Sequence, residues 1–229
     1  MKIMKHLTLL VLTIALFSIF SCGKKWKKPT ETSFKFQLNS NSNSGLVKFT
    51  SGFLTLNKIS FSGDRKQGQN QIDLDQTFSN NLQVNLAQSA INSGIRFDIP
   101  QGTYNKMEIK METDGDQTGT SLLILGYYIN TINDTIALQF EFPADDAIQI
   151  QAKNSSGGDQ IVLVEDRPVY PTVILNPSYW FATVPQSILE SASQTLINSV
   201  PTILINDNDN SDIYNLIVNR LESGNEIVF

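Results

Sequence analysis

Apolar and polar side chains alternate with a period of two from residue 33 to residue 175. The alternation is visible in FKFQL (34–38), LQVNL (82–86) and MEIKME (107–112), among other segments. A period of two puts alternate side chains on opposite faces of an extended strand, so each segment predicts a half-buried β-strand. We expect roughly ten strands and no helix between them. The region therefore predicts a mainly β fold, an antiparallel β-sandwich, because a parallel sheet would need crossover helices.

Turn-forming residues separate the predicted strands. Gly, Pro, Asn, Asp and Ser favour turns because they accept or preset the backbone angles that turns need. The run NSNSNSG (39–45) predicts a flexible loop rather than a domain boundary. The predicted turns lie at 62–64, 80–81, 100–102, 114–116, 133–134, 143 and 155–159.

The composition changes after residue 175, and residues 176–229 predict a helical segment. A helix is expected around 186–198, with Ile188, Leu189, Ala192 and Leu196 on one face. A second helix is expected after the polar run 206–212, with Gly224 as its C-terminal stop. Fifty-four residues are too few for a comfortable core of their own, so this segment should pack on the sandwich.

The N-terminus places the only cysteine of the chain, Cys22, after an apolar run and before four lysines. Lys2 and Lys5 precede the run 7–20, whose 14 residues suit a signal peptide and are too few for an ordinary membrane-spanning helix. The sequence IFSCG resembles the lipobox of bacterial lipoproteins, in which the cysteine is acylated and becomes the mature N-terminus. This resemblance implies a signal peptide at 1–21 and a lipidated basic tether at 22–32.

Two alternatives stay open for this N-terminal region. Cys22 can instead end an uncleaved hydrophobic anchor. The segment KKWKKP (24–29) can be a solvated linker, or its ammonium groups and indole can lie at a phospholipid headgroup layer. With either interpretation of this segment, the expected partner is a lipid bilayer, reached through acylated Cys22.

A second resemblance lies in GIRFDIPQGTYNKMEIKME (94–112), where a strand, a P-x-G-x-Y turn and another strand follow one another. The element is similar to one found in β-sandwich lipoproteins of unknown function with a transthyretin-like fold. It implies a fold and supplies no catalytic residues. From the residues alone, Pro100 fixes φ, Gly102 can take a positive φ, and the Tyr104 hydroxyl should bond to backbone.

Composition narrows the chemistry that the mature chain can perform. Removal of residues 1–21 would remove His6, the only histidine, and acylation of Cys22 would leave no free thiol. Triads with histidine and histidine-containing metal sites would then be excluded, and only carboxylates could support a glycosidase-type reaction. From Pro29 onward the chain has 11 Lys and Arg against 22 Asp and Glu, or −11, which argues against nucleic-acid binding. We expect no enzymatic activity.

Two acidic runs are weak candidates for a calcium site. In NDNDNSD (206–212), Asp207, Asp209 and Asp212 offer carboxylates, but the glycine and glutamate that an EF-hand needs are missing. Helix capping is the alternative for this run. Asp114 and Asp116 more simply predict a tight turn. No other cofactor is expected.

Aromatic and sulfur-containing side chains give two further candidates. Tyr179 and Trp180, followed by Phe181, could stack on a sugar ring, and buried packing between sandwich and helices is the alternative. Met107 and Met111 fall on one face of a strand and are expected in the core.

These observations predict a membrane-anchored envelope lipoprotein that is a non-catalytic binding or structural module. The alternative is a surface-exposed carbohydrate-binding or adhesion lipoprotein. Gly23 follows the cysteine where inner-membrane retention would favour Asp, so we expect the outer membrane. The lysines that follow favour its periplasmic face over the cell surface. An envelope protein or glycan is the expected partner.

Overall fold

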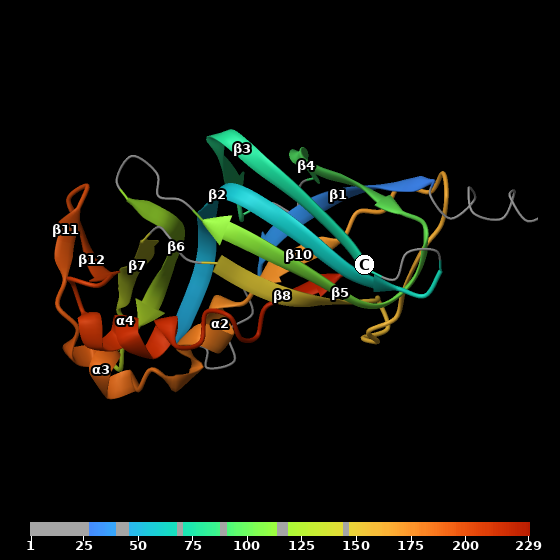
Figure 1. Ribbon diagram of the computed structural model, residues 1–229. Coiled ribbons are helices and arrows are strands. Elements are labelled where there is room, and N and C mark those ends of the chain that lie inside the picture. Colours follow the sequence, from blue (N-terminus) through green and yellow to red (C-terminus); the bar gives the residue numbers. More distant parts are fainter. Residues whose placement is uncertain (1–27, 40–45, 68–70, 88–90, 114–118, 144–146) are drawn as a thin grey trace, which may run out of the picture.

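The computed structural model describes residues 28–39, 46–67, 71–87, 91–113, 119–143 and 147–229, and strands dominate them (Figure 1). The prediction of a mainly β fold is confirmed. The first ten strands are β1 (Pro29–Leu38), β2 (Val47–Arg65), β3 (Gln71–Asn85), β4 (Ile91–Pro100), β5 (Gly102–Thr113), β6 (Thr120–Ile129), β7 (Thr135–Pro143), β8 (Ala147–Lys153), β9 (Ile161–Leu163) and β10 (Thr172–Leu175).

Short helices and three more strands follow β10. Every helix among the described residues lies in this C-terminal part, as the composition predicts. The elements are α2 (Pro177–Trp180), η1 (Phe181–Thr183), α3 (Gln186–Ser191), β11 (Thr195–Ile197), β12 (Val200–Ile205), α4 (Ser211–Val218) and β13 (Glu226–Val228). None of the helices in the described part of the chain has the length and apolar character needed to span a bilayer.

The long strand β2 joins two arms of the sheet. One edge of β2 pairs with β6 over residues 47–54 and with β5 over residues 56–65, while β3 pairs along its other edge. The register shifts between Leu56 and Lys58, at the point where the partner changes. Such a bulge bends a strand and increases its twist, so β2 can serve both arms.

All described strands belong to one mixed sheet of 13 strands, which curls strongly. Its path runs β11-β12-β7-β6-β2-β5-β8-β13-β10-β1-β4, with β3 on β2 and β9 on β5. The prediction of an antiparallel β-sandwich is therefore confirmed only in part, as a mainly β fold. Three strand pairs are parallel, namely β1 with β10, β7 with β12 and β8 with β13.

Each parallel pair contains one strand from the C-terminal quarter of the chain. The prediction that residues 176–229 only pack on the sheet as helices is wrong, because β11, β12 and β13 are part of it. The helix expected over 186–198 ends at Ser191, and 195–197 pairs with 200–202 as a hairpin. At the C-terminus, the ring of Phe229 packs edge-on against Phe34 of β1, with 6.3 Å between centroids.

Two of the predicted turns lie inside strands. Residues 62–64 continue β2, where they pair with both β3 and β5, and residues 80–81 lie in β3. Pairing along both edges of β2 outweighs the turn preference of Ser, Gly and Asp. The turns predicted at 100–102, 133–134 and 155–159 do connect successive strands. Residues 40–45 and 114–118, where a loop and a turn were expected, lie outside the described residues.

Alternate side chains of the strands form the core. Met107 and Met111 are fully buried, which confirms their predicted place in it. Around them lie Ile59, Phe61 and Ile109, each at most 1% exposed. The α2–η1 and α4 helices cover one side of the β6–β7–β12 arm, where Phe140 contacts the rings of Phe181 and Tyr214.

Candidate functional site

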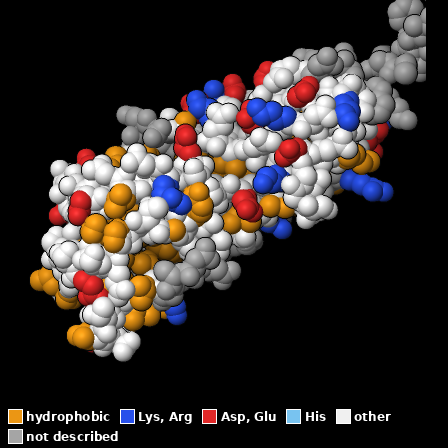
Figure 2. All heavy atoms as spheres, turned by 90° about the horizontal axis from the view of Figure 1, so that it is seen from below, with side chains coloured by type: hydrophobic (Ala, Val, Ile, Leu, Met, Phe, Trp, Pro, Cys, Tyr) orange, Lys and Arg blue, Asp and Glu red, His pale blue; other side chains and the backbone are white. Residues whose placement is uncertain are grey.

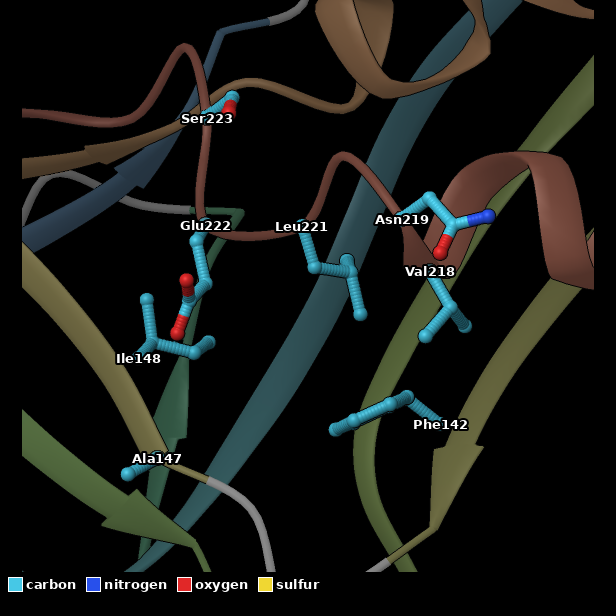
Figure 3. A pocket seen from close by; sticks show the side chains of 8 residues that line it. All are labelled: Phe142, Ala147, Ile148, Val218, Asn219, Leu221, Glu222 and Ser223. Atoms are coloured by element: carbon cyan, nitrogen blue, oxygen red, sulfur yellow. The ribbon is translucent and has the colours of Figure 1, made fainter.

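A cleft with a volume of about 260 Å³ lies where the end of β7, the start of β8 and the turn after α4 meet. Figure 3 shows its lining side chains, with those after α4 on one side and those of β7 and β8 on the other. These segments are about 75 residues apart in sequence, and the sheet brings them together. The lining residues are Phe142, Ala147, Ile148, Val218, Asn219, Leu221, Glu222 and Ser223.

One wall of the cleft comes from the sheet. Phe142 is 5% exposed and lies opposite Leu122 of β6 in the antiparallel ladder. Ile148 is 2% exposed and lies opposite Met111 of β5. Because β7 and β8 belong to different arms of the sheet, this wall spans the junction of the arms.

The other wall is the turn that follows α4. The helix ends at Val218, and the Leu221 N–H then donates to the Val218 carbonyl at 3.1 Å. This tight turn directs the Leu221 side chain inward, where it is 4% exposed. Arg220 fixes the turn to α2, because its Nε donates to the Tyr179 carbonyl at 3.1 Å and its guanidinium lies 4.1 Å from the centre of the Tyr179 ring.

Glu222 provides the charge of the cleft. Its side chain extends toward Ile148 in Figure 3, while the residue itself is exposed to solvent. Among the described residues, no Lys or Arg forms an ion pair with it. Of the eight lining residues, Glu222 alone carries a carboxylate, so they offer no carboxylate pair for glycosidase chemistry. The arrangement can bury an apolar group and hold a positive charge beside it.

The residues predicted to bind calcium lie in the loop between β12 and α4. Asn206 organises this loop, because its Oδ1 accepts hydrogen bonds from the N–H groups of Asn208 at 3.0 Å and Asp209 at 2.7 Å. Asp207 Oδ1 accepts a hydrogen bond from the amide of Asn208. Asp212 lies in the first turn of α4. No cluster of three or more His, Cys, Asp or Glu suited to a metal ion occurs in the described part of the chain.

Asn210, the N-cap residue of α4, has a left-handed backbone with φ of 48°. Its side chain does not cap the helix by a hydrogen bond. Instead, its amide donates to the carbonyls of Leu204 at 2.7 Å and Ser193 at 3.0 Å. Asn210 therefore connects the β11–β12 hairpin to the start of α4. Its side chain does not provide the helix capping that was the alternative to a calcium site.

The fold places Tyr179 and Trp180, the two residues predicted to stack on a sugar, in different environments. Trp180 is fully buried, so its indole is part of the core and has no free face for a ligand. Tyr179 is 38% exposed, but the Arg220 guanidinium already lies over its ring. Gly224 also packs closely on this ring, where a Cβ atom would be 2.5 Å from the Tyr179 Cγ. The stacking prediction for Trp180 is therefore wrong, because α2 turns this side chain inward.

A groove of about 430 Å³ at the N-terminal end of β1 is lined by charges of both signs. Arg96 lies 3.2 Å from Glu31 and 3.7 Å from Asp98. Lys28, the residue before β1, forms an ion pair with Glu165. The hydrogen bond to Glu165, helped by its charge, raises the pKa of Lys28 above the ordinary lysine value. Cys22, the predicted lipidation site, lies outside the described residues.

Glu190 of α3 links the helical region to the β6–β7 turn. Its Oε1 accepts hydrogen bonds from the Tyr128 hydroxyl at 2.6 Å and from the Thr131 N–H at 2.8 Å. The bond from Tyr128 lowers the pKa of Glu190, while burial and the Glu190 carboxylate raise the pKa of Tyr128 to about 12. The link fixes α3 on the sheet and lies outside the cleft.

Comparisons with protein-family models, with curated proteins and with solved structures found no match for this chain. The geometry of the cleft is therefore the basis for a functional argument. Sequence patterns did not reveal the cleft, because its apolar residues look like ordinary core positions and Glu222 follows a helix as an ordinary surface carboxylate. The one signal in the sequence is that Leu221 continues the apolar spacing of α4 and is directly followed by an acidic residue.

Proposed function

We propose that the chain is an envelope lipoprotein, anchored to the outer membrane through acylated Cys22, and that its β domain is a non-catalytic binding module. The lipobox-like sequence supports the anchor. A single large sheet that curls around its core suits a rigid scaffold of this kind. A rigid scaffold that holds a partner near a membrane needs a short connection to its anchor. It also needs a binding surface that lies away from the anchor.

The short connection carries the proposal. Strand β1 starts at Pro29, seven residues after Cys22. An extended chain spans roughly 3.3–3.6 Å per residue, so the first strand would lie within about 25 Å of the acyl chains. Lys28 is already fixed to the body by its ion pair with Glu165. The tether is then too short for the body to move far from the bilayer.

Three of the seven exposed large apolar side chains among the described residues lie at the opposite end of the molecule. Ile132 is 73% exposed in the β6–β7 turn, Leu196 is 72% exposed in β11, and Val200 is 50% exposed at the start of β12. Strand β12 runs parallel to β7, so the starts of these strands lie at the same end. Figure 1 places β11 and β12 far from the start of β1, and Figure 2 shows hydrophobic side chains at this end and charged ones toward the other. Exposed apolar side chains in a group favour a protein partner.

The test compares the natural chain with its Cys22→Ser variant in fractionated cells. The proposal predicts that the natural chain is found with the outer membrane and leaves it only in detergent, and that the variant is released or mislocalised. Association of both proteins with membranes to the same extent would contradict the lipid anchor. Protease added to intact cells should leave the body intact, and its rapid loss beside a surviving periplasmic marker would favour the surface-exposed adhesion alternative.

A further inference from the structure

We propose that the cleft between β7, β8 and the turn after α4 binds an ammonium group on an aliphatic stem, the chemistry of an alkylamine or of a lysine side chain. This inference rests on the proposed role as a binding module and names the class of ligand. Two features of the cleft carry it, its apolar walls and its single carboxylate.

The apolar walls select the stem. Phe142, Ile148 and Leu221 are each at most 5% exposed, and Figure 3 shows them together with Val218 around the cleft. Packing against such a surface removes methylene groups from water. Each methylene group that is fully buried tightens binding by about fourfold. The volume of about 260 Å³ leaves room for a linear side chain of this kind.

The carboxylate of Glu222 selects the charge. Several carboxylates on the sheet lie beside cations, for example Glu108 at 2.8 Å from Lys106 and Glu112 at 3.0 Å from Lys110. Glu222 has no such cation among the described residues and lies next to Ile148 at the edge of the cleft (Figure 3). A cation whose stem lies on the apolar wall would therefore place its charge beside an available carboxylate. The charge of −11 from Pro29 onward further favours a cation over an anion.

An NMR titration of the isotope-labelled full chain in detergent micelles tests the proposal. The probes are hexylammonium, butylammonium, hexanol and hexanoate, and the readout is the shift of the methyl signals of Ile148, Val218 and Leu221. We expect hexylammonium to bind most tightly, hexanol more weakly and hexanoate most weakly. Butylammonium, with two fewer methylene groups, should bind about 15-fold more weakly than hexylammonium.

The variant Glu222→Gln isolates the role of the charge. It should weaken hexylammonium binding by about two- to fivefold, the range for an exposed ion pair, and should leave hexanol binding unchanged. Glu226→Gln is the matched control, because Glu226 is also exposed but lies outside the lining of this cleft. It should change neither affinity.

A capped lysine amide separates the two sources of the ligand. Binding of this amide as tight as that of butylammonium, whose four-carbon stem matches that of lysine, supports a lysine side chain of a protein partner, and much weaker binding supports a free alkylamine. Equal binding of hexylammonium and hexanoate, or shifts that do not involve the cleft residues, would overturn the proposal. Neither result bears on the Cys22→Ser fractionation, so failure of this ligand and failure of the lipid anchor are distinguishable.

Discussion

The hydroxyl group of Tyr104 donates a 2.7 Å hydrogen bond to the carbonyl oxygen of Pro100, four residues earlier. The bond closes the P-x-G-x-Y turn between β4 and β5 and fixes a fully buried ring in the core. Gly102 lies between them with φ of 148°, where a Cβ atom would be 2.8 Å from the Arg65 side chain. The turn therefore needs its glycine and its tyrosine for two different physical reasons.

Tyr104→Phe should lower the free energy of unfolding by about 1 kcal/mol, because it removes one hydrogen bond and leaves a backbone carbonyl without this donor. Tyr127→Phe is the control, since the Tyr127 ring is only half-buried beside Lys48. Chemical denaturation measures both variants. Equal stability of Tyr104→Phe and the natural chain would mean that the hydrogen bond does not stabilise the turn.

Two buried tyrosines should make the fold sensitive to alkali. Burial raises the pKa of Tyr104 to about 12, and burial with Glu190 does the same for Tyr128. In the unfolded chain a tyrosine loses its proton near pH 10. The stabilisation is therefore complete below about pH 10 and is lost as the pH rises toward 12. Absorbance of tyrosinate should show that these two groups titrate together with unfolding, and their titration near pH 10 in the folded chain would contradict the burial.

The contact between Tyr128 and Glu190 predicts a loss of stability in acid. Because the pKa of Glu190 is lowered in the folded state, its contribution is complete above the ordinary glutamate pKa of about 4.3 and is lost as the pH falls through the lowered value. Tyr128→Phe should therefore destabilise the chain at pH 7 and have a smaller effect at pH 3. Denaturation at both pH values measures this, and an effect that is the same at both would exclude the charged hydrogen bond.

Gly126 allows β6 to lie close to β2. A Cβ atom at this position would overlap the carbonyl oxygen of Lys48. Gly126→Ala should cost about 1–3 kcal/mol, since backbone cannot move as a flexible side chain does. Gly157→Asn is the control, because no atom lies within 4 Å of its Cβ position and Asn tolerates the φ of 83°. Thermal unfolding of both variants checks the difference, and a stable Gly126→Ala variant would contradict this close approach.

Trp180→Ala should destabilise the chain by about 3–5 kcal/mol, as expected for loss of a fully buried aromatic side chain. Leu196→Ser, at a position 72% exposed, should change the stability by less than about 0.5 kcal/mol. Calorimetry of both variants compares a position in the core with an exposed position in β11. A Trp180→Ala variant of normal stability would contradict the burial of this side chain in the core.

Local patterns predicted much of the β fold. The alternation around Ile59, Phe61 and Ile109 predicted strands correctly because these side chains do form one buried face. Turn preference failed at residues 62–64, where pairing of β2 on both edges decides the structure. The hairpin of β11 and β12 was missed because Leu196 of β11 also fits the helical spacing of Ile188 and Ala192.

Long-range placement could not be predicted. The insertion of β13 between β8 and β10 depends on contacts between residues more than 50 positions apart. The cleft has the same origin, since Phe142 and Leu221 meet only when the sheet has formed. Burial of Trp180 likewise depends on which way α2 faces, and the sequence YWF does not determine that.

The mass of the mature chain, purified from cell membranes, tests the lipid anchor most directly. We predict an N-terminus at Cys22 that carries a diacylglyceryl group and loses its fatty acids on mild alkaline treatment. The Cys22→Ser variant should lack this mass. A mature chain that retains residues 1–21, or one that begins at Cys22 without lipid, would contradict the account.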